Sequence, residues 1–253
     1  MSKPYFVNDF ATLYYGNCLK ILKQLGDKTI DVIFADPPYF LSGGGVSCRS
    51  GKQVCVNKAN WDKKIDIEER LKFNRQWLKE CRRVLKDDGT IWISGTFHNI
   101  YSIGVSLEKE KYSIINNITW QKPNPAPNLA CRCFTNSTET ILWARKQLSP
   151  TKKGKHYFNY ALMKEINNNK QMKDVWDFKL PKKEEKKYGK HPTQKPVDLL
   201  IRIIQASTKE NDIVLDPFCG GSTTGVACKM LNRKYIGIDN VKEYLDLSIK
   251  RLK

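Results

Sequence analysis

The stretch TIDVIFADPPY, residues 29–39, decides how the rest of the chain is interpreted. Its first seven residues are mostly apolar and rich in β-branched side chains, a pattern typical of a parallel strand buried on both faces. Asp36 ends this run, and Pro37 and Pro38 stop the strand because proline has no N–H for a sheet hydrogen bond. The pattern therefore predicts a strand whose carboxyl end presents Asp36 and Tyr39 at fixed relative positions.

Similar strand patterns recur along the chain and alternate with helical ones. A short strand and a helix are expected within 11–25, strands at 90–94, 113–121, 138–144, 212–215 and 235–238, and helices at 67–85, 98–110, 196–206, 223–231 and after 239. This alternation predicts a doubly wound, mostly parallel sheet in one α/β catalytic domain that spans residues 1–253. In such sheets, ligands bind beyond the carboxyl ends of the strands.

A second strand end carries the glycine-rich sequence Asp216-Pro217-Phe218-Cys219-Gly220-Gly221-Ser222, directly before a predicted helix. Small residues let the backbone approach a ligand closely, and the helix N-terminus offers free N–H groups. The next strand ends at Asp239, where a carboxylate suits the two hydroxyls of a ribose. Because neither GxGxxG nor GxxxxGK[ST] occurs, the pattern indicates a nucleoside-containing cofactor without a pyrophosphate.

The chain is strongly basic, with 44 Lys and Arg against 26 Asp and Glu, a net charge of +18 over 253 residues. This excess predicts a polyanionic partner, although a generally basic proteome would give the same balance. Residues 146–190 are dense in lysine and lose regular periodicity. We interpret them as a peripheral region outside the core sheet that takes part in target recognition; a solvated surface is the alternative.

The composition also indicates the compartment. No apolar run is long enough to span a membrane, and the N-terminus lacks the apolar core of a signal peptide, so a cytoplasmic protein without membrane contact is expected. The eight cysteines form no CxxC pair, and only three histidines are present. We therefore expect reduced thiols and no metal site.

The order of these motifs resembles that of the β class of amino-group DNA methyltransferases, which use S-adenosylmethionine. Residues 36–39 come first, then the basic region, then His191-Pro192-Thr193-Gln194-Lys195-Pro196, and finally the glycine-rich motif, over nearly the whole chain. Residues 117–146 are most similar to GATC-modifying adenine enzymes, in particular the second, single-strand-tolerant methyltransferase of DpnII-type restriction systems. The resemblance implies a site-specific adenine-N6 methyltransferase in a restriction–modification context.

The resemblance also implies roles for individual residues. Asp36, helped by the Pro37 carbonyl, would accept a hydrogen bond from the amino group of an adenine flipped out of the DNA. Pro38 would fix the loop, Tyr39 would stack on the base, and Phe40 would close the base pocket. The residues expected to contact DNA are Phe40, Lys122, Asn124 and Arg132. A purely structural Arg132 remains an alternative to base contact.

For the cofactor, the resemblance places Thr193 and Lys195 at the methionine carboxylate and Asp239 at the ribose. The full set of expected cofactor-binding residues is Asn17, Cys18, Asp36, Thr193, Lys195, Asp216, Pro217, Phe218, Cys219, Gly220, Gly221 and Asp239. Two residues depart from the family pattern. Ser222 stands where glycine is usual, and Asn17 stands where an acidic residue is common.

Several alternatives stay open at this point. An N4-cytosine enzyme would more often carry Ser at position 36, and a protein-amide methyltransferase would carry Asn there. RNA methylation and a catalytically silent DNA-binding module are further alternatives. The expected partner is double- or single-stranded DNA, while a homodimer and a restriction endonuclease encoded nearby are left open.

Overall fold

The computed structural model describes residues 2–40, 46–49, 52–55, 64–125, 127–129, 131–149 and 154–253. The main sheet consists of β1 Phe6–Val7, β2 Ala11–Tyr15, β3 Ile30–Ala35, β6 Leu85–Gly95, β7 Tyr112–Gln121, β8 Thr138–Lys146, β9 Val175–Asp177, β10 Ile213–Asp216 and β11 Lys234–Asp239. A separate antiparallel hairpin pairs β4 Val46–Arg49 with β5 Lys52–Cys55. The helices are α1 Cys18–Leu22, α2 Ile67–Val84, α3 Ile100–Lys109, α4 Tyr160–Glu165, α5 Val197–Ser207, α6 Thr223–Met230 and α7 Lys242–Leu252, and residues Glu184–Lys186 form a short 3-10 turn.

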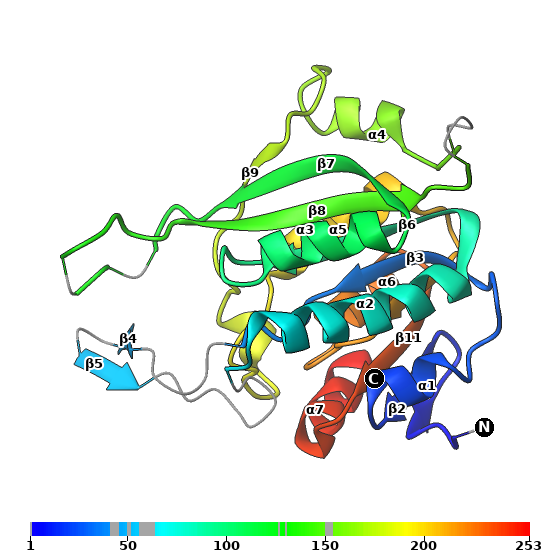
Figure 1. Cartoon of the computed structure of the whole chain (residues 1–253), viewed down its shortest axis with the longest axis horizontal. Helices are drawn as coiled ribbons and strands as arrows, with labels where there is room; N and C mark the ends of the chain where they lie inside the picture. The colour runs from blue at the N-terminus through cyan, green and yellow to red at the C-terminus, as the bar shows by residue number, and fades with distance from the viewer. Residues whose placement is uncertain are drawn as a thin grey trace.

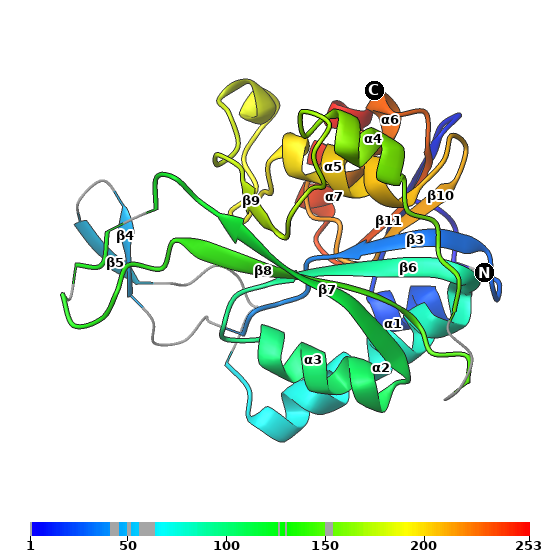
Figure 2. The same cartoon turned by 90° about the horizontal axis from the view of Figure 1, so that it is seen from above.

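The sheet has the strand order β1-β2-β11-β10-β3-β6-β8-β7-β9. The five neighbours from β2 to β6 run parallel, as expected for a doubly wound sheet. β8 runs antiparallel to both β6 and β7, so the connection between β7 and β8 begins and ends near the carboxyl edge of the parallel strands. This connection extends well beyond the sheet in two perpendicular views (Figures 1 and 2).

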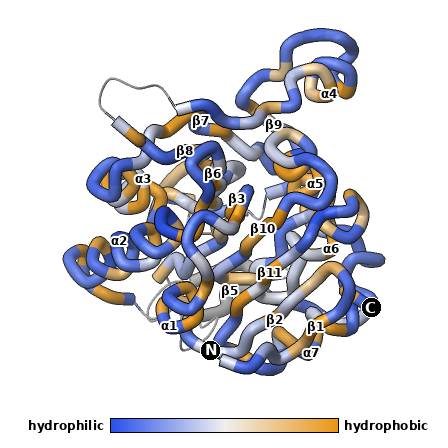
Figure 3. Tube along the Cα trace, turned by 90° about the vertical axis from the view of Figure 1, so that its right-hand side faces the viewer, coloured by the Kyte–Doolittle hydropathy of each residue, from blue (hydrophilic) through white to orange (hydrophobic). Residues whose placement is uncertain are grey.

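Helices cover both faces of the sheet, so the domain has three layers. Helices α1, α2 and α3 lie on one face, and α4, α5, α6 and α7 lie on the other (Figure 2). Along β3, Ile33 and Ala35 pack toward the first layer, while Val32 and Phe34 pack toward the second. Burial on both faces explains the nearly continuous apolar sequence of this strand. Hydrophobic residues likewise follow the central strands β10 and β11 (Figure 3).

One expectation about the basic region is wrong. Residues 146–190 were expected to stay outside the sheet, yet β9 pairs in parallel with β7 and forms its edge. Trp176 of β9 and Met163 of α4 are buried in the core. Burial of their apolar surface stabilises this part of the region against the sheet, although lysines surround it in the sequence. The region is thus peripheral but anchored, apart from 150–153, which lie outside the described residues. None of the described helices combines the length and apolarity needed to cross a membrane.

Candidate active site

Four adjacent strand ends form the site. β2, β11, β10 and β3 are parallel neighbours, so their carboxyl ends lie side by side and carry Asn17, Asp239, Asp216 and Asp36. After β10 the chain continues into α6 on one face, whereas after β3 it continues into α2 on the other. The crossover connections therefore diverge between β10 and β3, and a crevice opens at this topological switch point.

Two cavities lie at this edge. The larger, of about 240 Å³, is lined by Asn17, Cys18, Asp36, Thr193, Pro217, Phe218, Gly220 and Asp239, together with Gly16, Pro38, Phe40, Phe73, His191, Ile238, Asn240 and Tyr244. The smaller, of about 30 Å³, shares Asp36, His191, Thr193, Phe218 and Gly220 with it and adds, among others, Lys195, Asp216, Cys219 and Gly221. Every residue expected to bind the cofactor thus lines one cavity or the other.

The glycine-rich loop is shaped by hydrogen bonds to the two neighbouring carboxylates. Asp239 Oδ2 accepts from the Gly220 N–H at 2.8 Å, and Asp216 Oδ2 accepts from the Thr224 hydroxyl at 2.6 Å. Gly220 has a φ of +48°, and a Cβ built there would lie 2.9 Å from His191 Nε2. The backbone conformation and the close approach of His191 both require glycine at this position.

Ser222 also adopts the left-handed conformation, with a φ of 51°. This is where the family usually has glycine, so the departure noted in the sequence falls on a strained backbone. Ser222 keeps the loop closed, since its N–H donates to the Cys219 carbonyl at 2.7 Å and its hydroxyl accepts from Tyr235 at 3.3 Å. Asn17, the other departure, caps α1 by accepting from the Leu19 N–H at 2.9 Å.

Burial dominates the protonation of the groups around the cavities. It raises the pKa of Asp216 to about 7, although hydrogen bonds from Thr224 and the Phe218 N–H oppose the shift. Burial likewise raises the pKa of Cys18 to about 12, which keeps this thiol protonated. For His191, burial and the nearby Lys195 charge lower the pKa to about 4, so its ring is neutral at physiological pH.

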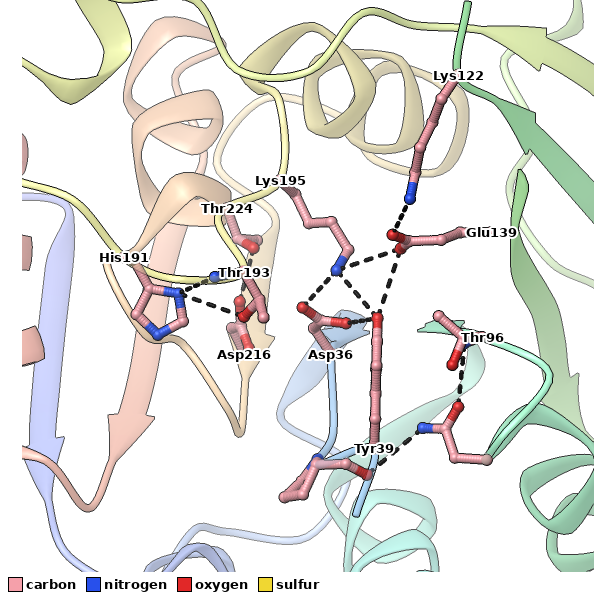
Figure 4. A network of polar contacts seen from close by, with 12 residues as sticks. Asp36, Tyr39, Thr96, Lys122, Glu139, His191, Thr193, Lys195, Asp216 and Thr224 are labelled. Atoms are coloured by element: carbon pink, nitrogen blue, oxygen red, sulfur yellow. Dashed lines mark hydrogen bonds and ion pairs between the residues drawn. The ribbon is translucent and has the colours of Figure 1, made fainter. Parts of the chain in front are cut away.

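A buried polar network surrounds Asp36 (Figure 4). Asp36 Oδ1 accepts from the Tyr39 hydroxyl at 2.6 Å, and Oδ2 accepts from Lys195 Nζ at 2.7 Å. Lys195 Nζ also donates to the Tyr39 hydroxyl at 3.0 Å and lies 3.4 Å from Glu139 Oε2. The other carboxylate oxygen of Glu139, Oε1, pairs with Lys122 Nζ at 2.5 Å.

The charges in this network support one another. Burial lowers the pKa of Lys195, but the charges of Asp36 and Glu139 outweigh it and hold the pKa well above its usual value. Burial raises the pKa of Glu139, but Lys195 and Lys122 bring it below its usual value. The pKa of Asp36 is raised by burial against the opposing charge of Lys195. The network therefore contains a buried ammonium group shared between two carboxyl groups.

The structure shows the surroundings of three further expected residues. Lys195 Nζ pairs with Asp36, Tyr39 and Glu139, the acceptors that satisfy its buried charge, and its contact with the cofactor carboxylate stays a prediction. Phe40 lines the larger cavity and packs edge-to-face on Phe73 at 5.8 Å, and Lys122 pairs with Glu139. Contact of Phe40 and Lys122 with DNA stays a prediction as well.

The remaining expected residues fall into two groups. Tyr39 is buried and lines neither of the two cavities, so its stacking on a base stays a prediction. Asn124 and Arg132 are exposed on the β7–β8 connection, as surface recognition requires. Glu139, Phe73 and Tyr244 were not anticipated. Glu139 and Phe73 lie far from the motifs in sequence, whereas Tyr244 lies only five residues beyond Asp239 and could have been found by extending that motif.

The residues present fit S-adenosylmethionine. Gly220 brings the backbone against the cavity, Asp239 and Asn17 supply polar atoms for a nucleoside, and Phe218, Phe40 and Phe73 supply apolar walls. Within the described ranges, no group of His, Cys, Asp and Glu side chains could hold a metal ion.

Solved structures with the same arrangement identify the class. The complex of M1.HpyAVI with S-adenosylmethionine has a TM-score of 0.70 and 31% sequence identity, covering 96% of this chain and 99% of that one. The cytosine-N4-specific PvuII DNA methyltransferase has a TM-score of 0.79 over 100% of this chain and 89% of that one; at 18% identity it shows the fold alone. The fold and site are those of an S-adenosylmethionine-dependent methyltransferase, as expected from the sequence.

Sequence comparison then gives the family. The family model described as DNA methylase (N6_N4_Mtase) matches residues 30–250. The type II methyltransferases M2.LlaDCHI of Lactococcus lactis subsp. cremoris and M2.DpnII of Streptococcus pneumoniae are 59% and 58% identical, each over 100% of this chain and 93% of the relative. M2.MboI of Moraxella bovis is 49% identical over 98% of this chain and 90% of the relative. The chain belongs to the DNA methylase family, and the resemblance to the amino-group DNA methyltransferases is confirmed.

Proposed function

We propose that this chain transfers a methyl group from S-adenosylmethionine to N6 of an adenine flipped out of DNA, at a short site such as GATC in a restriction–modification system. The observation that carries the proposal is the position of Asp36. Its carboxyl group lies at the carboxyl end of β3 and lines both cavities that the cofactor-binding residues surround. A hydrogen-bond acceptor for the target amino group thus adjoins the expected cofactor site.

The chemistry requires orientation more than covalent assistance. Bound S-adenosylmethionine supplies a methyl group on a sulfonium, so that its C–S bond breaks as the new N–C bond forms. The adenine amino group is a weak nucleophile because its lone pair is conjugated with the ring. Asp36 and the Pro37 carbonyl accept its hydrogen bonds, favour a tetrahedral nitrogen and aim the lone pair. Because burial raises the pKa of Asp36, its carboxylate can take up the proton that the methylated nitrogen releases.

Adenine is favoured over cytosine by the residue at position 36. Enzymes of the N4-cytosine type tend to carry Ser where this chain has Asp36, and the 18%-identical PvuII enzyme supports only the shared fold. The relatives at 49–59% identity are named type II methyltransferases of the DpnII, LlaDCHI and MboI systems, which supports the restriction–modification context.

The β7–β8 connection is proposed to contact the target DNA. It leaves the sheet at the catalytic edge, exposes Asn124 and Arg132, and presents Phe134 with 97% of its surface exposed. An apolar ring of this kind can fill the gap that a flipped base leaves in a duplex. Residues 146–190 are proposed to add phosphate contacts, which predicts binding that weakens steeply with salt.

The wider setting is part of the same proposal. By analogy with relatives, this chain is cytoplasmic and forms a homodimer, and a cognate restriction endonuclease is encoded nearby. The oligomeric state is measured by analytical ultracentrifugation at assay concentrations. Sedimentation as a monomer both with and without DNA would contradict the proposed homodimer.

The proposal is tested with labelled S-adenosylmethionine on duplexes with and without GATC, followed by mass spectrometry of the nucleosides. We expect N6-methyladenine confined to GATC-containing DNA. N4-methylcytosine would contradict the choice of base, and N6-methyladenine in other sequences would retain the activity but reject GATC. Transfer to RNA alone, or to no nucleic acid, would reject the proposed substrate.

A further inference from the structure

Both oxygens of the Asp36 carboxyl group already accept a hydrogen bond. Its Oδ1 accepts from Tyr39 and its Oδ2 from Lys195, at 2.6 Å and 2.7 Å. An adenine amino group that approaches the Oδ2 side of Asp36 is an uncharged donor, and it has to displace the Lys195 ammonium from this oxygen or share the oxygen with it. Charge-assisted hydrogen bonds are the stronger ones, so Lys195 competes with the substrate for this carboxylate.

Lys195 cannot simply leave. Its side chain is only 6% exposed, and a buried ammonium that loses its partner is strongly unfavourable. Glu139 lies on the opposite side of the ammonium, with Oε2 at 3.4 Å from Lys195 Nζ, a distance that a small shift converts into a close ion pair. Glu139 is itself buried and held by Lys122 at 2.5 Å, so it offers a fixed second acceptor (Figure 4).

We propose that Glu139 is a positioning residue that receives the Lys195 ammonium when the amino group of the target adenine takes its place at Asp36. This inference rests on the proposed function. Lys195 moves from the Asp36 side toward Glu139 as the base enters, and no bond other than these hydrogen bonds is made or broken. Without the Glu139 charge, Lys195 stays paired with Asp36 and excludes the amino group.

The position of Glu139 also connects this exchange to the DNA-contacting loop. Glu139 is the second residue of β8, and Lys122 directly follows β7, so their ion pair closes the base of the β7–β8 connection. The Lys122–Glu139 ion pair therefore joins the base of this connection to the carboxylate that lies beside Lys195.

The test measures how much the target amino group contributes to binding. Equilibrium affinity is measured by fluorescence anisotropy, with S-adenosylhomocysteine present, for duplexes that carry adenine or purine at the methylated position opposite an abasic site, so that neither base has a pairing partner to lose. Purine lacks the amino group, so the ratio of the two dissociation constants reports the hydrogen bond of this group to the protein. We expect the wild-type chain to prefer adenine about tenfold, the ratio that a single hydrogen bond of about 1.4 kcal/mol gives.

Glu139→Gln should reduce the ratio of the two dissociation constants to near one. The affinity for S-adenosylhomocysteine should stay within about twofold of wild type, a difference of ~0.4 kcal/mol, which indicates an unperturbed cofactor site. In a Lys195→Met background, where no ammonium competes for Asp36, adding Glu139→Gln should change the preference no further. Glu139→Asp keeps the charge and should restore part of the preference. The matched control is Glu110→Gln, a similarly buried glutamate that pairs with Arg75 at 2.7 Å away from the site.

Two outcomes would overturn the inference. One is a Glu139→Gln chain that still prefers adenine as strongly as wild type, and the other is an effect of Glu139→Gln that persists undiminished without Lys195. If Glu139→Gln does not fold, a Glu139→Asp chain that folds but shows no adenine preference would also contradict it. A wild-type chain that neither prefers adenine nor methylates it would instead reject the proposed function itself.

Discussion

Replacing Gly220 by alanine tests whether the glycine-rich loop is built around close packing against His191. The φ of +48° places alanine in the left-handed region, and its Cβ would lie 2.9 Å from Nε2 and 3.0 Å from Cε1 of His191. His191 cannot rotate away freely, because its ring packs on Tyr244 with centroids 4.3 Å apart. The backbone penalty and the overpacking together should lower the free energy of unfolding by about 2–5 kcal/mol.

For a chain of this size, that loss lowers the melting temperature by roughly 5–15 °C, measured by differential scanning calorimetry. The same shift moves the wall of the larger cavity, so calorimetric titration should show weaker binding of S-adenosylmethionine. Gly221→Ala is the comparison, because its φ lies outside the left-handed region and its Cβ would meet only milder contacts, Arg251 Nη1 at 3.1 Å and Leu247 Cδ2 at 3.3 Å. The reasoning is refuted if Gly220→Ala melts and binds like Gly221→Ala.

Three further predictions concern stability, pH and substrate form. Gly104→Ala on α3 meets no atom within 4 Å and should raise the free energy of unfolding by up to about 1 kcal/mol in urea titrations; a loss of stability would contradict this. Because burial raises the pKa of Asp216 from 3.8 to about 7, its contribution to stability is present at low pH and is lost as pH rises through about 7. Wild type should therefore lose stability relative to Asp216→Asn between pH 5 and pH 8, and a constant difference would argue against the shift. Phe134→Ala should slow methylation of duplex DNA while leaving single-stranded DNA unaffected, and equal loss on both would exclude a role in base flipping.

Local patterns predicted most of the fold because each one has a direct physical cause. The apolar run before Asp36 is buried on both faces of the sheet, and the glycine-rich loop lies where close approach requires it. Parallel strands bring their carboxyl ends together, so motifs 180 residues apart, at Asp36 and Asp216, could be assigned to one site. The twelve expected cofactor-binding residues accordingly line the two cavities.

The partners of buried charges could not be predicted in the same way. Lys195 lies in the loop before α5, and its long side chain reaches Asp36 just after β3 and Glu139 on β8. Lys122 was expected to contact DNA, and the sequence does not show that Glu139 lies beside it. The many lysines of residues 146–190 likewise indicated a surface region, but Trp176 is buried in the core and β9 pairs with β7 at the edge of the sheet.

Asp36 is proposed to accept the hydrogen bond of the target amino group next to the bound cofactor. The most direct test compares wild type and Asp36→Ala in single-turnover methyl transfer, with cofactor affinity measured separately. We expect Asp36→Ala to transfer the methyl group at least about 10²-fold more slowly, the scale of losing one group aimed at the reacting centre, with S-adenosylmethionine still bound. A variant that binds the cofactor and methylates DNA at the wild-type rate would contradict it.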